Sequence, residues 1–287
     1  MFEITGDDIA SLNDVDLRAL IARLCEATLR RRGHSASAVT WGGNQTAADA
    51  GLDVRVELDR NAAIDGFIPR PDTGFQVKKT DMPASAITKE MKPGGKLRPV
   101  IRDLATRGGA YIMVSSMGST SDSALMARRT AMWSAVRRIK GASALALDFY
   151  DRTRLASWVH DHPGLIPWVR ARIGKSITGW QSYGAWAYSP DGIEDNYILD
   201  ETARIWGDRK EDAGGAPVLA GIATLRDRLR EEKTCVRLVG LSGVGKTRLV
   251  QALFDHRVGN SGLDPSLAFY TNVADDPDPQ PIALASD

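Results

Sequence analysis

"GLDVRVELDRNAAIDGFIPRPDTGFQVKK", residues 51–79, contains two short extended segments separated by turn-forming residues. In residues 52–58, leucine and valine alternate with charged residues, which is the period of a half-buried strand. The second segment, "GFQVKK" at 74–79, follows a cluster of proline, aspartate and glycine that is typical of a turn. We therefore predict two strands that pair with each other.

Helices and strands are predicted to alternate on both sides of this pair. A helix over 12–33 precedes it, with Asn13 or Asp14 as the N-cap and Gly33 as the stop. The segments after it are predicted as helices at 85–91 and 99–108, a strand at 110–116, a helix at 122–141 and a strand at 144–151. This order predicts an α/β domain built on a mixed sheet.

Three aromatic-rich segments follow, at 155–174, 179–188 and 196–206. Their tryptophans are predicted to pack in the protein interior, and a platform for stacking bases is the alternative. Residues 191–217 are polar and glycine-rich and are predicted to form a linker. Beyond the linker we predict a helix at 218–232, a buried strand at 235–241 and a helix at 247–254.

The sequence "GLSGVGKT", residues 240–247, matches the phosphate-binding loop pattern G-x-x-x-x-G-K-[ST]. Glycines let main-chain N–H groups face phosphate oxygens, and a helix N-terminus adds partial positive charge. Lys246 is predicted to reach the β- and γ-phosphates of ATP, and the Thr247 hydroxyl to bind Mg²⁺. The predicted nucleotide-binding residues are Gly240, Ser242, Gly243, Val244, Gly245, Lys246, Thr247 and Arg248.

NTP hydrolysis also needs an acidic residue at the end of a later strand. The segment "SLAFYTNVADD" at 266–276 ends in Asp275 and Asp276, and we predict it to be the next strand of the sheet. The catalytic acid is then expected still further along. We therefore expect the 287 residues to be the front of a longer protein, interrupted inside an NTPase module.

A second constellation lies in the opening stretch. Asp53 is on the first strand, and Gln76 and Lys78, two residues apart, share one face of the second. A carboxylate and an amide oxygen can bind Mg²⁺, and a lysine can orient water or stabilise charge during phosphodiester hydrolysis. Glu26, on the first helix, is a further candidate Mg²⁺ ligand.

The distribution of charge along the chain bears on whether it binds nucleic acid. The net charge of +1 argues against a globally basic protein, yet residues 74–111 carry eight lysines or arginines against three acids. There, Lys79, Lys89, Lys92 and Lys96 are predicted to contact DNA phosphates without reading sequence.

The composition also bears on cellular location, on zinc binding and on the state of the two cysteines. The sequence has no apolar stretch long enough to cross a bilayer and no secretory signal at its start, so we expect a cytoplasmic location. The four histidines form no zinc pattern with cysteines, and Cys25 and Cys235 are predicted to be buried and unpaired.

Residues 1 to about 150 resemble the PD-(D/E)xK restriction-endonuclease-like superfamily, in its Mrr-like branch, through "DAGLDV" and "FQVKK". The resemblance implies that Asp53, Gln76 and Lys78 are catalytic, with glutamine in place of the second acid. Residues 218–287 resemble the start of a STAND-class NTPase. The expected domains are thus a nuclease with its aromatic-rich extension at 1–190, a linker at 191–217 and the NTPase start at 218–287.

A nuclease followed by such an NTPase resembles the layout of prokaryotic antiviral STAND proteins. That family implies a large C-terminal sensor for a viral protein, oligomerisation on activation and DNA degradation by the N-terminal nuclease. Two alternatives remain open at this point. One is an ATP-dependent DNA-binding regulator that cleaves nothing, and the other is a modification-dependent restriction enzyme driven by NTP.

Overall fold

The structure is a computed structural model that describes residues 3–42, 51–118, 120–183, 202–207, 214–255, 257–278 and 280–281. The chain divides into two compact units, Met1–Ser176 and Ile177–Asp287. Across the described residues, no helix combines the length and apolar character needed to span a bilayer.

A five-stranded mixed sheet forms the centre of the first unit. Its strands, in spatial and chain order, are β1 (Val39–Trp41), β2 (Val54–Glu57), β3 (Asp72–Lys78), β4 (Ala110–Ser115) and β5 (Ala146–Tyr150). The β1–β2 and β2–β3 pairs are antiparallel, whereas β3–β4 and β4–β5 are parallel. The predicted α/β domain with a mixed sheet is confirmed. Strand β1 was not predicted, because its three residues are too few to show an alternating pattern.

The four helices predicted in this unit are present, with ends set by local signals: α2 (Asp14–Arg31), α3 (Ala84–Met91), α4 (Pro99–Arg107) and α5 (Asp122–Val136). Three further helices were not predicted: α1 (Gly6–Ser11), α6 (Arg152–His160) and α7 (Ile166–Arg172). Short 3₁₀ turns are η1 (Ala36–Ala38), η2 (Pro93–Gly95), η3 (Ala142–Ala144) and η4 (Pro163–Leu165). Asn13 caps α2 as expected, since its side chain accepts a hydrogen bond from the Asp16 N–H. Gly108, at φ 71°, ends α4 in the left-handed conformation that glycine adopts without strain.

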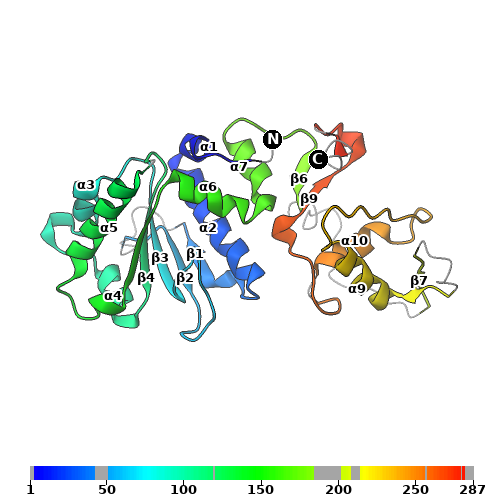
Figure 1. The fold of residues 1–287 in the computed structure, drawn as a ribbon, viewed down its shortest axis with the longest axis horizontal. Coiled ribbons are helices and arrows are strands. Elements are labelled where there is room, and N and C mark those ends of the chain that lie inside the picture. Colours follow the sequence, from blue (N-terminus) through cyan, green and yellow to red (C-terminus); the bar gives the residue numbers. More distant parts are fainter. Residues whose placement is uncertain are drawn as a thin grey trace. The chain divides into compact units, whose positions relative to one another are not determined.

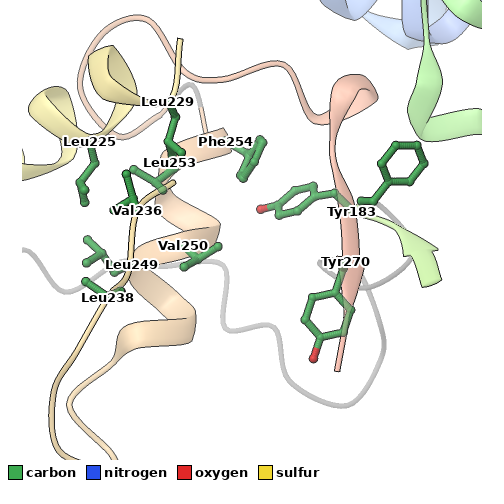
Figure 2. Close-up of a pocket in the computed structure, with 11 residues that line it drawn as sticks. Tyr183, Leu225, Leu229, Val236, Leu238, Leu249, Val250, Leu253, Phe254 and Tyr270 are labelled. Carbon is green, nitrogen blue, oxygen red and sulfur yellow. The ribbon is translucent and has the colours of Figure 1, made fainter. Parts of the chain in front are cut away.

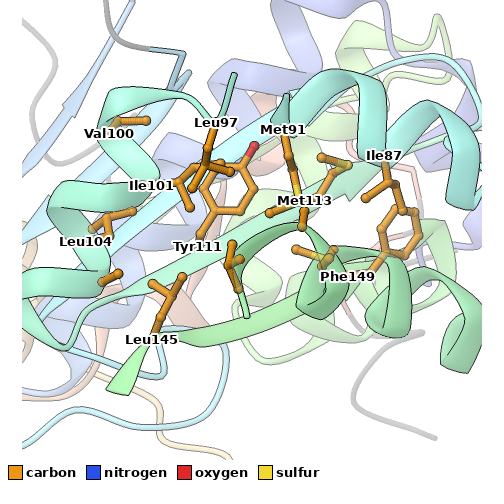
Figure 3. Packing of buried hydrophobic residues seen from close by; sticks show 14 of the residues in the cluster. Ile87, Met91, Leu97, Val100, Ile101, Leu104, Tyr111, Met113, Leu145 and Phe149 are labelled. Atoms are coloured by element: carbon orange, nitrogen blue, oxygen red, sulfur yellow. The ribbon is translucent and has the colours of Figure 1, made fainter. Parts of the chain in front are cut away.

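Helices α3, α4 and α5 cover one face of the sheet, and α2 and α6 lie on the other (Figure 1). On the first face, Tyr111 and Met113 of β4 and Phe149 of β5 pack against apolar residues of the three helices (Figure 3). On the second face, Trp158 of α6 is fully buried and stacks on Phe67 at a centroid distance of 5.0 Å. Packing is thus the observed role of Trp158.

The second unit contains two small sheets and two helices. β6 (Trp180–Ser182) pairs antiparallel with β9 (Phe269–Thr271), and β7 (Arg204–Ile205) pairs with β8 (Ala216–Pro217). α9 (Val218–Arg228) and α10 (Lys246–Phe254) pack together around a core of Ile222, Ala252, Leu253 and Val258. The 3₁₀ turns η5 (Pro265–Leu267) and η6 (Val273–Asp275) flank β9.

The predicted buried strand at 235–241 is wrong. This segment has no regular secondary structure, and Val239 and Leu241 are 75% and 80% exposed. A strand needs a hydrogen-bonded neighbour. We predicted that the segment 266–276, which contains β9, would lie in the same sheet as 235–241, but β9 pairs with β6 instead. Cys235 is accordingly exposed, contrary to prediction, whereas Cys25 is buried as expected.

The boundary between the compact units falls after Ser176, so residues 177–183, assigned from sequence to the nuclease part, lie in the second unit. Of the predicted linker, residues 191–201 and 208–213 lie outside the described residues. The parts of it that are described, β7 and β8, pack against α9.

Candidate functional site

Asp53 lies immediately before β2 and is fixed to β3 by three hydrogen bonds. Its main-chain N–H donates to the Phe75 carbonyl at 2.9 Å. Its carboxylate oxygen Oδ2 accepts from Gln76 Nε2 at 2.8 Å and from the Val77 main-chain N–H at 2.7 Å. The hydrogen bonds that join β2 to β3 therefore hold this carboxylate at one defined position.

Gln76 and Lys78 project from the face of β3 that α3, α4 and α5 cover. The parallel register aligns Gln76 with Met113 and Lys78 with Ser115, and Met113 belongs to the core on that face. Lys78 also acts on Asp53 electrostatically, since its charge lowers the pKa of the Asp53 carboxyl. The structure thus brings together the three residues that the sequence singled out.

Burial raises the pKa of Asp53 above its ordinary value, because a charge away from water is disfavoured. The Val77 N–H, Arg18 and Lys78 act in the opposite direction. The Arg18 Nη1 atom lies 3.8 Å from Asp53 Oδ1. The ionised carboxylate is therefore incompletely compensated, which favours a bound cation.

Two buried polar atoms near Asp53 have no hydrogen-bond partner: the Gln76 carbonyl oxygen Oε1 and the Tyr111 hydroxyl. Gln76 is only 5% exposed, and its amide nitrogen is used by Asp53, so the oxygen remains free to bind a ligand. Burial, together with the negative charges of Glu90 and Asp53, raises the pKa of Tyr111. An unpaired buried oxygen costs free energy unless a ligand or water satisfies it.

The donor set of Asp53 and Gln76 fits Mg²⁺, which prefers carboxylate and carbonyl oxygens and keeps several of its waters. A complete cage of protein ligands is not seen here. Within the described ranges, no three His, Cys, Asp or Glu side chains gather at one place.

Glu90, near the end of α3, belongs to this site and was missed by sequence reasoning. Its Oε1 atom lies 3.1 Å from Lys78 Nζ and 2.7 Å from Arg98 Nη2. Arg98 Nε also donates to the main-chain carbonyl of Glu90 at 2.8 Å. The only sequence signal was an acid within the basic segment 74–111, and such a signal does not specify a contact with Lys78.

Glu26, the further predicted metal ligand, pairs with Arg30 on its own helix at 3.5 Å. Among the described residues, no hydrogen bond or ion pair joins Glu26 to Asp53. The α2 residue that approaches Asp53 is Arg18. Glu26 lies eight positions later, about 12 Å farther along the helix axis.

The four lysines that we predicted to contact DNA differ in their surroundings. Lys79 Nζ donates to the carbonyl oxygens of Ala10 and Leu12 and so caps the C-terminal end of α1. It is therefore engaged with the protein itself. Lys89 and Lys96 are exposed and Lys92 is half-buried, all three on α3 or in the turn that follows it.

The predicted phosphate-binding loop is an exposed loop that leads into α10. Gly243 and Gly245 have φ values of 82° and 86°, which residues with a side chain rarely adopt. Helix α10 begins at Lys246 without a side-chain cap, so its first-turn N–H groups remain available to an anion. Lys246 Nζ donates to the carbonyls of Gly240 and Leu241, at 2.8 and 2.6 Å.

The other predicted loop residues lie close by. Ser242, Val244 and Thr247 are exposed, and Arg248 Nη1 donates to Gln251 Oε1 on α10 at 3.1 Å. In place of the predicted buried strand, an exposed segment without regular structure enters the loop. The loop thus has glycine geometry suited to a phosphate, and the sheet expected to support it is not formed by the described residues.

A cavity of about 260 Å³ lies beside α10 in the second unit (Figure 2). Leu225, Leu249 and Phe254 line it, together with Val236 and Tyr270. Its lining is mainly apolar, so it does not resemble a phosphate site.

We compared the chain with protein-family models, with curated proteins and with solved structures, and nothing matched.

Proposed function

We propose that the chain is a Mg²⁺-dependent DNA endonuclease joined to an ATP-binding module. The observation that carries this proposal is the convergence of Asp53, Gln76 and Lys78, with the buried Gln76 Oε1 unpaired. The first unit would then be a restriction-endonuclease-like domain, as the resemblance of "DAGLDV" and "FQVKK" to PD-(D/E)xK enzymes implies.

Each residue has a distinct part in the proposed reaction. Asp53 and Gln76 would hold Mg²⁺, which supplies an activated water and neutralises the phosphate. The Lys78 ammonium orients that water and stabilises the charge that develops on the phosphate oxygens. Lys89, Lys92 and Lys96 would contact DNA phosphates, which gives binding without sequence preference and a strong dependence on salt.

The second unit would bind ATP through Gly240–Thr247, with Lys246 at the phosphates and Thr247 at Mg²⁺. By its resemblance to antiviral STAND proteins, we propose that this module is a switch that responds to a viral protein and promotes oligomerisation. A site that binds one metal cuts one strand, so paired protomers would produce double-strand breaks. The cytoplasm is the compartment in which such a switch would operate.

The test is cleavage of plasmid and linear DNA with Mg²⁺, with and without ATP and a lysate of virus-infected cells. We expect Lys78→Ala to lower cleavage by about 100-fold or more and to leave DNA binding nearly unchanged. Lys140→Ala, a charge-matched change at an exposed position four residues after the end of α5, should retain activity. Lys246→Ala should abolish ATP binding, and Lys233→Ala, in the same unit, should not.

DNA binding without cleavage under every condition would refute the nuclease and favour a DNA-binding regulator. Cleavage that requires methylated DNA and not the lysate would favour a modification-dependent restriction enzyme. Cleavage that Lys78→Ala leaves unchanged would place the chemistry elsewhere in the chain.

A further inference from the structure

Glu90 occupies a position that helix stability alone does not favour. It lies in the last turn of α3, where the partial negative charge of the helix end repels a carboxylate. Its side chain is 19% exposed and lies between Lys78 and Arg98, which offset that repulsion. An acid at this place is thus explained by its two cationic partners.

Arg98 connects Glu90 to the loop that leads into Asp53. Its Nε donates to the Glu90 main-chain carbonyl and its Nη2 contacts the Glu90 carboxylate, so two bonds fix the guanidinium. A Cβ atom added at Gly51 would lie 2.5 Å from Arg98 Nη1. The absence of a side chain at Gly51 therefore lets the guanidinium pack against this loop, two residues before Asp53.

We propose that Glu90 and Arg98 are positioning residues that hold the Lys78 ammonium in place beside Asp53. This inference rests on the proposed nuclease function, in which Lys78 acts on the reacting phosphate. Lysine has a long flexible side chain, and a single carboxylate contact at 3.1 Å restricts its terminal group. Arg98 restricts Glu90 in turn, and both are placed against the segment that carries Asp53.

The same contacts argue against Glu90 as a direct metal ligand. Its Oε1 atom already interacts with two cations, and a divalent ion at that oxygen would be repelled by both. Asp53 differs, because it accepts hydrogen bonds from the neutral Gln76 amide and Val77 N–H, and Arg18 is at 3.8 Å. The metal is therefore assigned to Asp53 and Gln76, and Glu90 to Lys78.

The first test does not require nuclease activity. The full chain and its Glu90→Gln variant are treated with a limiting amount of acetic anhydride, and acetylation of each lysine is measured by mass spectrometry. The Glu90 carboxylate contacts the Lys78 ammonium at 3.1 Å and so limits its movement and its access to the reagent. We expect Glu90→Gln to raise labelling of Lys78 by about threefold, with Lys89 and Lys92 unchanged.

Two further variants control this experiment. Glu57→Gln removes an acid that pairs with Arg55 and Arg107, and it should leave Lys78 labelling unchanged. Arg98→Lys keeps the charge and loses the two-bond contact, so it should raise Lys78 labelling by a smaller factor than Glu90→Gln. Lys78 labelling that is the same in wild type and Glu90→Gln overturns the proposal.

The second test measures DNA cleavage as a function of Mg²⁺ concentration. Glu90→Gln should lower kcat by about 10- to 100-fold and leave the Mg²⁺ concentration for half-maximal rate unchanged. A rise of that concentration with Glu90→Gln would instead make Glu90 a metal ligand and overturn the positioning role. If the wild type does not cleave DNA, the proposed function fails, and the labelling result still decides whether Glu90 holds Lys78.

Discussion

Replacing Arg226 with methionine should strongly destabilise the second unit. Arg226 lies on α9, is 1% exposed and carries a guanidinium whose donors all point at main-chain carbonyls. Its five hydrogen bonds, of 2.7–2.9 Å, reach the carbonyl oxygens of Ala252, Leu253, Asp255, Val258 and Asn260. These acceptors include the end of α10, the helix that begins with Lys246, so the arginine fastens this helix to α9.

The size of the expected loss in stability follows from the burial of these hydrogen bonds. Three of them, to Ala252, Leu253 and Val258, are buried, and the other two are partly buried. Methionine keeps the apolar stem and removes every donor, so the buried carbonyls lose their partner without gaining water. At about 1 kcal/mol or more for each buried acceptor, we expect a loss of about 3–5 kcal/mol in the free energy of unfolding.

Hydrogen exchange measured by mass spectrometry can report this loss locally, on peptides of α10. A loss of about 3 kcal/mol corresponds to an exchange rate that is more than about 100-fold faster. The control is Arg228→Met on the same helix, because Arg228 is exposed and its pair with Glu231 is at 3.8 Å. That change should alter stability by about 0.5 kcal/mol at most. Equal protection of α10 in Arg226→Met and wild type would refute the reasoning.

Three further predictions concern the first unit. Burial raises the folded-state pKa of Asp53, so stability falls as pH rises from the unfolded value of about 3.9 through the folded one. Asp53→Asn can keep both hydrogen bonds, which share Oδ2, and should melt at a higher temperature than wild type at neutral pH but not in acid. Tyr111→Phe removes an unpaired buried hydroxyl and should raise the free energy of unfolding, measured by urea titration, by up to about 1 kcal/mol. A clear decrease in that free energy would instead show that the hydroxyl has a hydrogen-bond partner. Gly109→Ala would place a Cβ 2.5 Å from the Asp72 carbonyl oxygen and should cost about 2–3 kcal/mol in the same titration, and an unchanged midpoint would contradict this.

Local sequence signals were sufficient to predict most of the strands and helices of the first unit. Strands β2 and β3 follow from alternation and turn residues, and β4 follows from an apolar run that is buried at every position. The face shared by Gln76 and Lys78 follows from the two-residue period of a strand. Each of these features is determined by neighbours in the chain, which is why it could be predicted.

Features that depend on distant partners were missed or mistaken. The apolar segment 235–241 has the composition of a strand, but no neighbouring strand pairs with it among the described residues, and composition cannot supply one. Glu90 reaches Lys78 only because α3 folds back over β3, a contact that the twelve-residue separation does not encode. Lys79 looked like a DNA-binding lysine, and its contact with α1 depends on residues almost seventy positions earlier.

Three local costs converge on the same part of the first unit. Asp53 is a half-buried carboxylate with a raised pKa, Gln76 Oε1 is a buried oxygen without a partner, and Glu90 lies at the unfavourable end of its helix. A domain that served stability alone would be better built with apolar residues at these positions. A cation beside Asp53 and Gln76 would remove the costs at those two residues. The contacts of Glu90 with Lys78 and with Arg98 already offset the cost of its place at the helix end. The concentration of these costs around Asp53, Gln76 and Glu90 favours a functional site here, independently of any resemblance to known nucleases.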